Sequence, residues 1–259
     1  MSYNNLTMEK KDGVGIVTIT RPKSLNALNS QLLDELFAVF TEIKNDDEVK
    51  AVVVTGEGRA FVAGADIAEM VKLSTSEIRK MALRGQEVMN LIEDIDKVVI
   101  AAVNGFALGG GNELAMACDF RFASEKAKFG QPEVNLGILP FFGGTQRLPR
   151  IVGKGMAKYL ICSADMIDAE EALRIGLVER IFSPEELVDA AIDFAKKIMT
   201  KSPIGVRMAI NAINKGMDMD RSNGISYEAE IAVNTFCSED RITGMEAFLA
   251  KEEPKFAEK

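Results

Sequence analysis

The chain has 259 residues, of which 47% are hydrophobic and 27% charged, the balance of a globular protein with a substantial buried core. Its net charge of −8 argues against a uniformly basic face for nucleic acid. The chain contains no histidine, which excludes Ser-His-Asp and Cys-His mechanisms and metal sites built on histidine. Proton transfer must therefore fall to Glu, Asp, Lys, Tyr or Cys.

The three cysteines, Cys118, Cys162 and Cys237, are far apart and form no CxxC pair. They indicate neither a disulfide framework nor a thiolate metal site, so we expect no bound metal. Residues 1–11 lack the apolar stretch of a signal peptide, and the longest apolar run, residues 98–103, is too short to cross a bilayer. We therefore expect a cytoplasmic protein without a membrane segment.

Strand and helix patterns alternate through the first two-thirds of the chain, which predicts an α/β fold. In chain order, the patterns predict a strand at 14–20, a helix at 30–44 capped by Ser30, a strand at 49–55, a loop at 56–66, a helix at 76–96, a strand at 98–103, a helix at 113–117, and strands at 120–123, 128–130 and 177–182.

Helical spacing dominates the last third, at residues 185–199, 203–215, 224–236 and 239–251. A composition shift at Ser202-Pro203 predicts a catalytic domain over residues 1–200 and a helical region over 201–259. The helical region carries more apolar residues than a solvated appendage needs. We expect it to pack on the main domain or on another subunit.

Glycine is concentrated between the strand at 98–103 and the helix that follows, at Gly105, Gly109, Gly110 and Gly111. Such a turn permits close approach of backbone to a ligand and places helix N–H groups toward an anionic oxygen. The spacing matches neither a dinucleotide-binding nor a P-loop motif. The alternative is a plain tight turn between strand and helix.

Two glutamates have surroundings that are unusual for a carboxylate. Glu113 lies in the first turn of a helix of small and apolar residues, and Glu133 follows Pro132 among apolar residues and glycine. Taken singly, each could be an ordinary carboxylate, at a helix N-terminus and in a solvated loop respectively. If both carboxylates lay in one desolvated pocket, their pKa values would differ, with one ionised and one protonated. Such a pair suits acid/base chemistry near neutral pH. Asp66 is better explained as the N-cap of the next segment.

The sequence resembles the crotonase, or enoyl-CoA hydratase, superfamily over nearly its whole length. The matching motifs include FVAGAD at 61–66, GGGNEL at 109–114 and FGQPE at 129–133. Further matches lie at 19–23 and 25–28, 101–105, 107–108, 143–148, 172–178 and 247–251. The resemblance implies an α/β crotonase-like spiral of ββα repeats with a C-terminal helical trimerisation region, assembled as a homo-oligomer, a dimer of trimers.

The resemblance also implies an activity and its residues. Glu113 would act as base toward water and Glu133 as acid toward the α-carbon, in reversible syn hydration of a short trans-2-enoyl-CoA. Backbone N–H groups of Ala63 and Gly110 would form the oxyanion hole. No cofactor is implied, because coenzyme A is part of the acyl-CoA substrate. Implied contacts with coenzyme A and substrate are Lys23, Ser24, Leu25, Ala65, Asp66, Ile67, Gly109 and Phe142, with Phe248 and Lys251 reaching a neighbouring subunit's nucleotide.

One departure from the family pattern concerns Phe141 and Phe142, which replace smaller residues found in many members. If their rings point inward they shorten the acyl pocket, so we expect a short substrate. The alternatives are another reaction on this fold, namely double-bond isomerisation, decarboxylation or thioester hydrolysis, and a non-catalytic binding protein. Retention of both glutamates and of the glycine-rich turn favours the hydratase.

Overall fold

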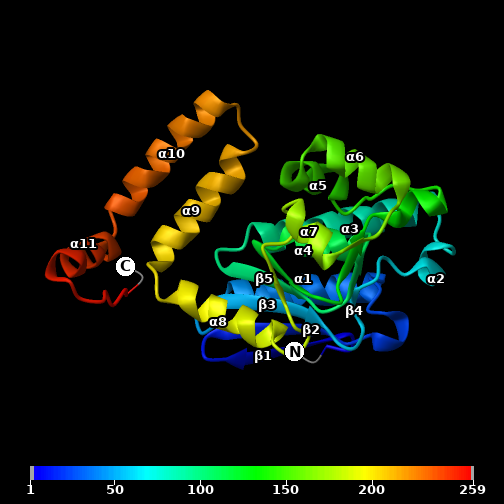
Figure 1. Ribbon diagram of the computed structural model, residues 1–259, viewed down its shortest axis with the longest axis horizontal. Coiled ribbons are helices and arrows are strands. Elements are labelled where there is room, and N and C mark those ends of the chain that lie inside the picture. The colour runs from blue at the N-terminus through cyan, green and yellow to red at the C-terminus, as the bar shows by residue number, and fades with distance from the viewer. Residues whose placement is uncertain (1–2, 258–259) are drawn as a thin grey trace. The chain divides into compact units, whose positions relative to one another are not determined.

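The computed structural model describes residues 3–257. Two sheets form the framework of a first compact unit, which ends at Asp193 (Figure 1). The six-stranded sheet has the order β1 (Leu6–Lys11), β2 (Val14–Ile19), β3 (Ala51–Gly56), β5 (Val98–Val103), β7 (Phe120–Ser124) and β10 (Arg180–Phe182), parallel except for β1 against β2. The four-stranded sheet has the order β4 (Ala60–Val62), β6 (Phe106–Leu108), β8 (Lys128–Gly130) and β9 (Ile167–Asp168), parallel except for β8 against β9.

From β3 to β8, consecutive strands alternate between the two sheets. β3 enters the larger sheet and β4 the smaller, and the same alternation recurs for β5 with β6 and for β7 with β8. A helix follows the first two pairs, and the short 3₁₀ helix η2 (Pro132–Leu136) follows the third. The α/β architecture built from ββα repeats is therefore confirmed. Every residue of β3 and β5 is buried, as expected for parallel strands covered on both faces.

Helices cover the sheets of the first unit: α1 (Ser30–Lys44), α2 (Ile67–Met70), α3 (Thr75–Glu93), α4 (Gly110–Ala117), α5 (Gly144–Val152), α6 (Lys154–Ser163) and α7 (Ala169–Arg174), with a 3₁₀ turn η1 (Pro22–Ser24). The helix α1 begins where predicted, but Asn29 caps it and Ser30 does not. The Asn29 side chain accepts from the N–H of Leu32 at 2.9 Å, because its extended backbone points the amide oxygen at the open first turn.

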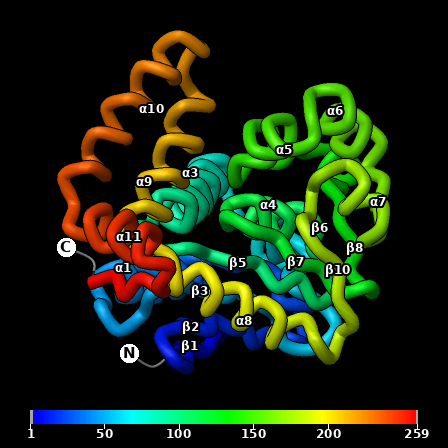
Figure 2. The backbone as a smooth tube through the Cα atoms, turned by 60° about the vertical axis from the view of Figure 1, so that its left-hand side comes forward, coloured from blue at the N-terminus to red at the C-terminus, as the bar shows by residue number. Residues whose placement is uncertain are grey.

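The second compact unit begins at Phe194, and its described part contains helices and no strand, as the helical spacing predicts. It contains α9 (Pro203–Gly216), α10 (Arg221–Phe236) and α11 (Glu239–Ala250), while α8 (Leu187–Met199) runs across the boundary. Helices α9 and α10 lie side by side as an antiparallel pair (Figure 2). Asp240 is buried within this unit, where it accepts from the Ser202 hydroxyl at 2.9 Å and the Ala257 N–H at 3.2 Å.

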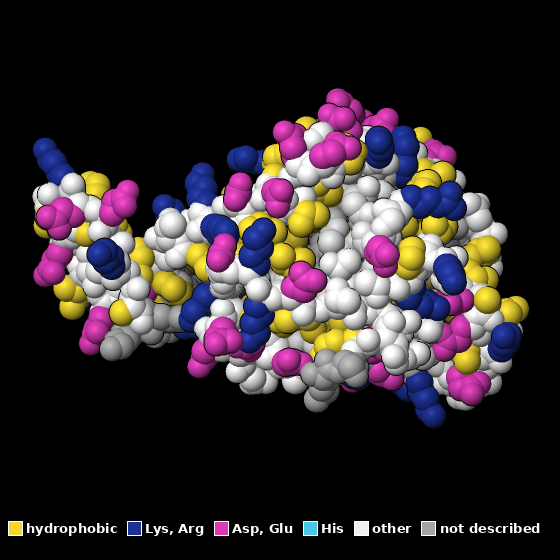
Figure 3. Space-filling model, turned by 90° about the horizontal axis from the view of Figure 1, so that it is seen from below, with side chains coloured by type: hydrophobic (Ala, Val, Ile, Leu, Met, Phe, Trp, Pro, Cys, Tyr) yellow, Lys and Arg dark blue, Asp and Glu magenta, His cyan; other side chains and the backbone are white. Residues whose placement is uncertain are grey.

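Acidic and basic side chains are interspersed on the face of the molecule drawn in Figure 3. No broad basic patch is seen on this face. Within residues 3–257, no helix is both long enough and apolar enough to cross a membrane.

Candidate active site

A cavity opens where the parallel strands β4, β6 and β8 end. Its empty volume is about 480 Å³. Each of the three ββα repeats contributes one segment to it, because the carboxyl ends of neighbouring parallel strands share one edge of the sheet. Residues 63–65 follow β4, Gly109 and Gly110 follow β6, and Pro132 and Glu133 follow β8. The remaining lining is Ile67, Met70, Leu108, Glu113, Leu136, Ile138, Phe141 and Phe142.

The glycine-rich turn before α4 is more than a plain tight turn. A Cβ at Gly111 would lie 1.8 Å from the carbonyl oxygen of Val62, so only glycine lets α4 start against β4. Gly109 has φ +50°, and a Cβ there would lie 2.8 Å from Oε1 of Glu133. The glycines therefore permit two close approaches, one to the sheet backbone and one to a carboxylate in the cavity.

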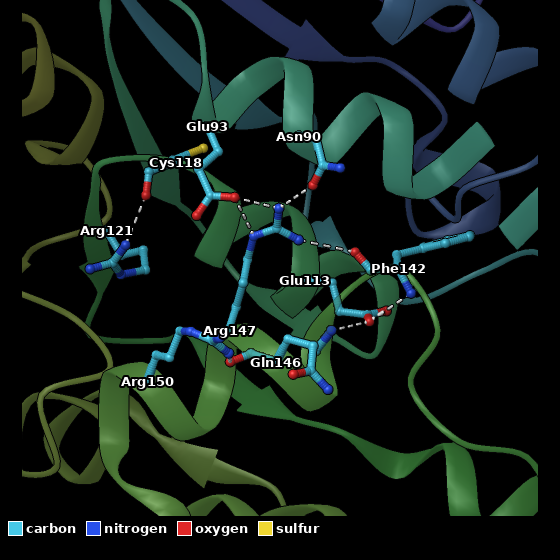
Figure 4. Close-up of polar contacts among 10 residues, drawn as sticks. Asn90, Glu93, Glu113, Cys118, Arg121, Phe142, Gln146, Arg147 and Arg150 are labelled. Atoms are coloured by element: carbon cyan, nitrogen blue, oxygen red, sulfur yellow. Dashed lines mark hydrogen bonds and ion pairs between the residues drawn. The ribbon is translucent and has the colours of Figure 1, made fainter. Parts of the chain in front are cut away.

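Glu113 is held by the backbone of residues 142–144. Its side chain is 1% exposed, and Oε1 accepts from the N–H groups of Phe142 at 2.8 Å and Gly144 at 2.6 Å (Figure 4). Burial raises the pKa of Glu113 to about 7, and the charge of Glu133 adds to this rise. The two N–H donors and the positive charge of Arg147 act in the opposite direction on the same pKa.

Glu133 lies in η2, with 8% of its surface exposed. Burial raises the pKa of its carboxyl to about 7 as well. Two carboxyls of similar pKa in one cavity can hold a single proton between them near neutral pH. This arrangement provides a base and an acid at the same time, which is what addition of water across a double bond requires.

Sequence reasoning missed Gln131, although it belongs to the FGQPE motif. Gln131 is fully buried. With its amide oriented to satisfy both of its polar atoms, the nitrogen donates to Oε1 of Glu133 at 3.1 Å and to the carbonyl of Gly109 at 3.3 Å. It thereby fixes the Glu133 carboxyl beside the glycine turn. A polar side chain two residues before a candidate acid, in an otherwise apolar segment, was the available signal.

Replacement of Glu113 by glutamine is expected to stabilise the protein at high pH. Because burial raises the pKa of Glu113 from 4.5 to about 7, the folded state holds a proton that the unfolded state releases. The stability from this proton is complete below pH 4.5 and is lost as the pH rises through 7. The variant's free energy of unfolding should therefore exceed the parent's by up to about 3 kcal/mol above roughly pH 8, and by little at about pH 5.

Denaturant unfolding at both pH values measures this difference, with the exposed Glu170→Gln as the matched control. A difference of the same size at the two pH values would contradict a raised pKa for Glu113.

The structure corrects the expectation for one oxyanion-hole donor. The N–H of Ala63 donates to the carbonyl of Leu25 at 3.0 Å and is therefore already engaged. Ala65 pairs with Leu28 as an isolated parallel bridge, in which Leu28 bonds to the residues on either side of Ala65. The N–H of Ala65 consequently points away from Leu28. Among residues 3–257, neither this N–H nor that of Gly110 donates to a protein acceptor, and both residues line the cavity.

The other predicted contact residues are placed unevenly. Ile67, Gly109 and Phe142 line the cavity with Ala65, whereas Lys23, Ser24 and Leu25 lie outside its lining, in and just after η1. The Asp66 side chain caps α2 through the N–H of Glu69 and pairs with Arg21 at 3.1 Å, so the N-cap interpretation is confirmed. Phe248 lies in α11 and Lys251 at its C-cap, both in the second unit.

Comparison with known proteins agrees with this geometry. Residues 9–259 match the family model described as enoyl-CoA hydratase/isomerase. The chain is 52% identical to the short-chain-enoyl-CoA hydratase of Clostridium acetobutylicum, over 97% of each chain. It is 50% identical to the crotonyl-CoA hydratase of Syntrophomonas wolfei, over the full length of both.

Solved structures agree as well. The crystal structure of enoyl-CoA hydratase from Bacillus anthracis superposes with a TM-score of 0.95 at 38% identity, covering 99% of this chain and 100% of that one. The sequence matches span both compact units, and the structural match extends over the ββα repeats and the helical C-terminal region. The chain therefore belongs to the enoyl-CoA hydratase/isomerase family.

Proposed function

We propose that the protein is an enzyme that catalyses reversible syn hydration of short-chain trans-2-enoyl-CoA to 3-hydroxyacyl-CoA. The observation that carries this proposal is the pair Glu113 and Glu133, both buried in one cavity and both with the pKa raised to about 7. The names of the relatives from Clostridium acetobutylicum and Syntrophomonas wolfei support hydration of a short enoyl-CoA. Double-bond isomerisation needs only one carboxylate, so the second buried glutamate favours hydration.

In the proposed mechanism, ionised Glu113 takes a proton from water as the water oxygen bonds to the β-carbon. Electron density moves onto the thioester oxygen, which the N–H groups of Ala65 and Gly110 hold as it gains enolate charge. Protonated Glu133 then delivers its proton to the α-carbon. Glu113 ends protonated and Glu133 ionised, and return of the proton through solvent or between the carboxyls restores the starting state. Burial raises the pKa of both carboxyls, so either one can hold the proton near neutral pH.

The test is turnover of crotonyl-CoA, followed by loss of the ultraviolet absorbance of the enoyl thioester and by identification of 3-hydroxybutyryl-CoA. Absence of this product would reject the proposal, whereas a shifted double bond, carbon dioxide or free coenzyme A would identify one of the alternative reactions on this fold.

Contacts with the coenzyme A moiety form a further part of the proposal. Lys23 and Ser24 are exposed, and the residue that follows them, Leu25, accepts from the N–H of Ala63 in the cavity lining. We propose that Lys23 and Ser24 supply polar groups for the nucleotide or pantetheine. The reaction needs no cofactor beyond the coenzyme A carried by the substrate. Phe248 and Lys251, both exposed, are proposed to reach the nucleotide of a neighbouring subunit. We place the protein in the cytoplasm on the basis of its sequence.

A homo-oligomer, specifically a dimer of trimers, is also proposed. Large apolar side chains of the second unit are exposed, among them Ile213, Val233, Phe248 and Leu249. Exposed apolar surface of this kind usually marks a contact with another chain. The molar mass in solution, measured by light scattering, tests the assembly, and a monomer at micromolar concentration would reject it.

Replacement of Phe142 by alanine is expected to lengthen the acceptable acyl chain. The ring closes the cavity next to α3, where a Cβ at Gly85 would lie 2.1 Å from it. Removing the ring opens space between α3 and α4, and each buried methylene then contributes roughly a fourfold gain. The ratio of kcat/KM for an eight-carbon over a four-carbon enoyl-CoA should rise by at least about tenfold.

Phe182→Ala provides the control, because that ring packs on Phe122 outside the cavity. An unchanged ratio in Phe142→Ala would show that the ring does not limit the chain length.

A further inference from the structure

Arg147 forms a cluster of contacts that the proposed chemistry does not itself use. It projects from α5, and its side chain is 11% exposed. Nε donates to Oε2 of Glu93 at 3.0 Å, and Nη2 donates to the same oxygen and to Oδ1 of Asn90 at 2.8 Å. Nη1 donates to the carbonyl of Phe142 at 3.3 Å (Figure 4). One guanidinium thus joins the last turns of α3 to the segment that precedes α5.

That segment is the one that holds Glu113. Phe142 donates its N–H to Glu113 while its carbonyl accepts from Arg147, so this residue is fixed at both ends. Gly144 supplies the second donor to Glu113. Between them, Gly143 has φ +111°, and a Cβ there would lie 2.2 Å from Nη1 of Arg147. The guanidinium therefore occupies the space beside Gly143 that any larger residue would need.

A neighbouring contact reinforces the same connection. Nε2 of Gln86, also on α3, donates to the carbonyl of Phe141 at 2.9 Å. Both carbonyls that precede Gly143 are therefore held by side chains, one from α3 and one from α5. The two N–H donors cannot leave Glu113 without breaking these bonds or the pairing of Arg147 with Glu93.

We propose that Arg147 is a positioning residue for the reaction: it holds the 142–144 turn, with its two N–H donors, against Glu113. The proposal rests on the proposed hydratase function. It assigns Arg147 no contact with substrate. Its effect reaches the reaction through the two N–H donors and through its own charge.

The charged groups around Glu113 fix the direction of the electrostatic effect. Glu133, from η2, raises the pKa of Glu113, and Arg147, from α5, lowers it. Glu93, from α3, neutralises part of the Arg147 charge through their ion pair. Removing Arg147 should therefore raise the pKa of Glu113, whereas neutralising Glu93 should lower it.

The experiment compares the parent with Arg147→Met, Arg147→Lys and Glu93→Gln, using crotonyl-CoA across a range of pH. For Arg147→Met we expect kcat to fall about 10- to 100-fold, because the donors to Glu113 are misplaced. KM should change by less than about threefold, because Arg147 touches no substrate. The acid limb of kcat/KM should move up by about one pH unit.

The other variants separate charge from geometry. Lysine keeps the positive charge, so the acid limb of Arg147→Lys should stay within about 0.3 pH unit of the parent. It lacks the planar guanidinium that makes several hydrogen bonds at once, so kcat should still fall. Glu93→Gln should move the limb to lower pH. Arg150→Met, on the same helix, is the matched control and should leave kcat and the limb unchanged, because its guanidinium donates to the carbonyl of Gln146 away from Glu113.

A fall in kcat for Arg147→Met with an unmoved acid limb would overturn the proposal and leave Arg147 a merely structural role. A shift in the same direction for Arg147→Met and Glu93→Gln would also overturn it. If Arg147→Met does not fold, the unmoved acid limb expected for Arg147→Lys and the lower one expected for Glu93→Gln still decide the matter.

Titration of ¹³C-labelled glutamate by NMR, with Glu113→Gln to assign the signal, gives the ionisation of Glu113 without any turnover. If the parent fails to hydrate crotonyl-CoA, the proposed function fails, yet a higher Glu113 pKa in Arg147→Met would still support the role of Arg147. If the parent is active and Arg147→Met leaves the pKa of Glu113 unchanged, only the proposed role of Arg147 is rejected.

Discussion

Replacement of either Glu113 or Glu133 by glutamine is expected to lower kcat for crotonyl-CoA hydration by about 10²- to 10⁴-fold, the usual contribution of general acid/base catalysis. Glutamine keeps the shape of the side chain but can neither take the proton from water nor deliver one to the α-carbon. Both carboxyls are almost fully buried, so solvent cannot readily replace them. KM should change little, because neither substitution removes surface that contacts the substrate.

The double variant, with both Glu113 and Glu133 replaced by glutamine, tests whether the two carboxyls act together. If the two carboxyls act as a unit on one water, losing both should cost little more than losing the first, because the effects of coupled residues are not additive. The control is Glu170→Gln, an exposed glutamate in α7 that should leave kcat unchanged. A single variant with at least half of the parent's kcat would remove that residue from the proposed mechanism.

Replacement of Gly109 by alanine is expected to lower kcat nearly as much as Glu133→Gln. The new Cβ would lie 2.8 Å from Oε1 of Glu133, so the carboxyl must move from its bond with Gln131. Displacement by about 1 Å at a reacting group costs roughly 10²-fold. Alanine at φ +50° and ψ −122°, a backbone conformation that side chains disfavour, adds strain of about 1–3 kcal/mol, which should lower the free energy of unfolding.

A control variant separates the effect of backbone strain from the effect of the contact with Glu133. Gly176 also has a positive φ, +77°, and a Cβ added there would meet no atom within 4 Å, so Gly176→Ala introduces strain at positive φ without a new contact. We expect it to lower the unfolding free energy and to leave kcat unchanged. Equal effects on kcat in the two variants would mean that strain, and not the contact with Glu133, accounts for the loss.

Periodicity predicts the long elements well and the short ones poorly. The strand at 98–103 and the helix at 30–44 have the bounds that their patterns predict, since each offers several repeats of its period. β4 and β6 have three residues each and lie where the sequence predicts loops, and the patterns also miss β1, β9, α2, α5, α6 and α7. These elements are specified by the neighbours that they pair with or pack on, which no local pattern records.

The sequence also predicts some residues of the candidate site and not others. Local context makes Glu113 and Glu133 notable, but only the family motifs join them across the chain. The choice between Ala63 and Ala65 as amide donor depends on the pairing of Leu28 with Ala65, and that register is a tertiary fact. Arg147 stands out in the sequence only as part of a motif, because its partners Asn90 and Glu93 come from a helix more than fifty residues earlier.

The edge formed by β4, β6 and β8 divides the groups of the site among the turns that follow these strands. Each repeat places its own groups at the cavity: Ala65 follows β4, Gly110 and Glu113 follow β6, and Glu133 follows β8. The strands set the spacing between these turns at about 4.8 Å, whatever side chains follow them. Exchange of one of these turns therefore changes the groups that it brings to the cavity and leaves the backbone amides of the neighbouring turns in place.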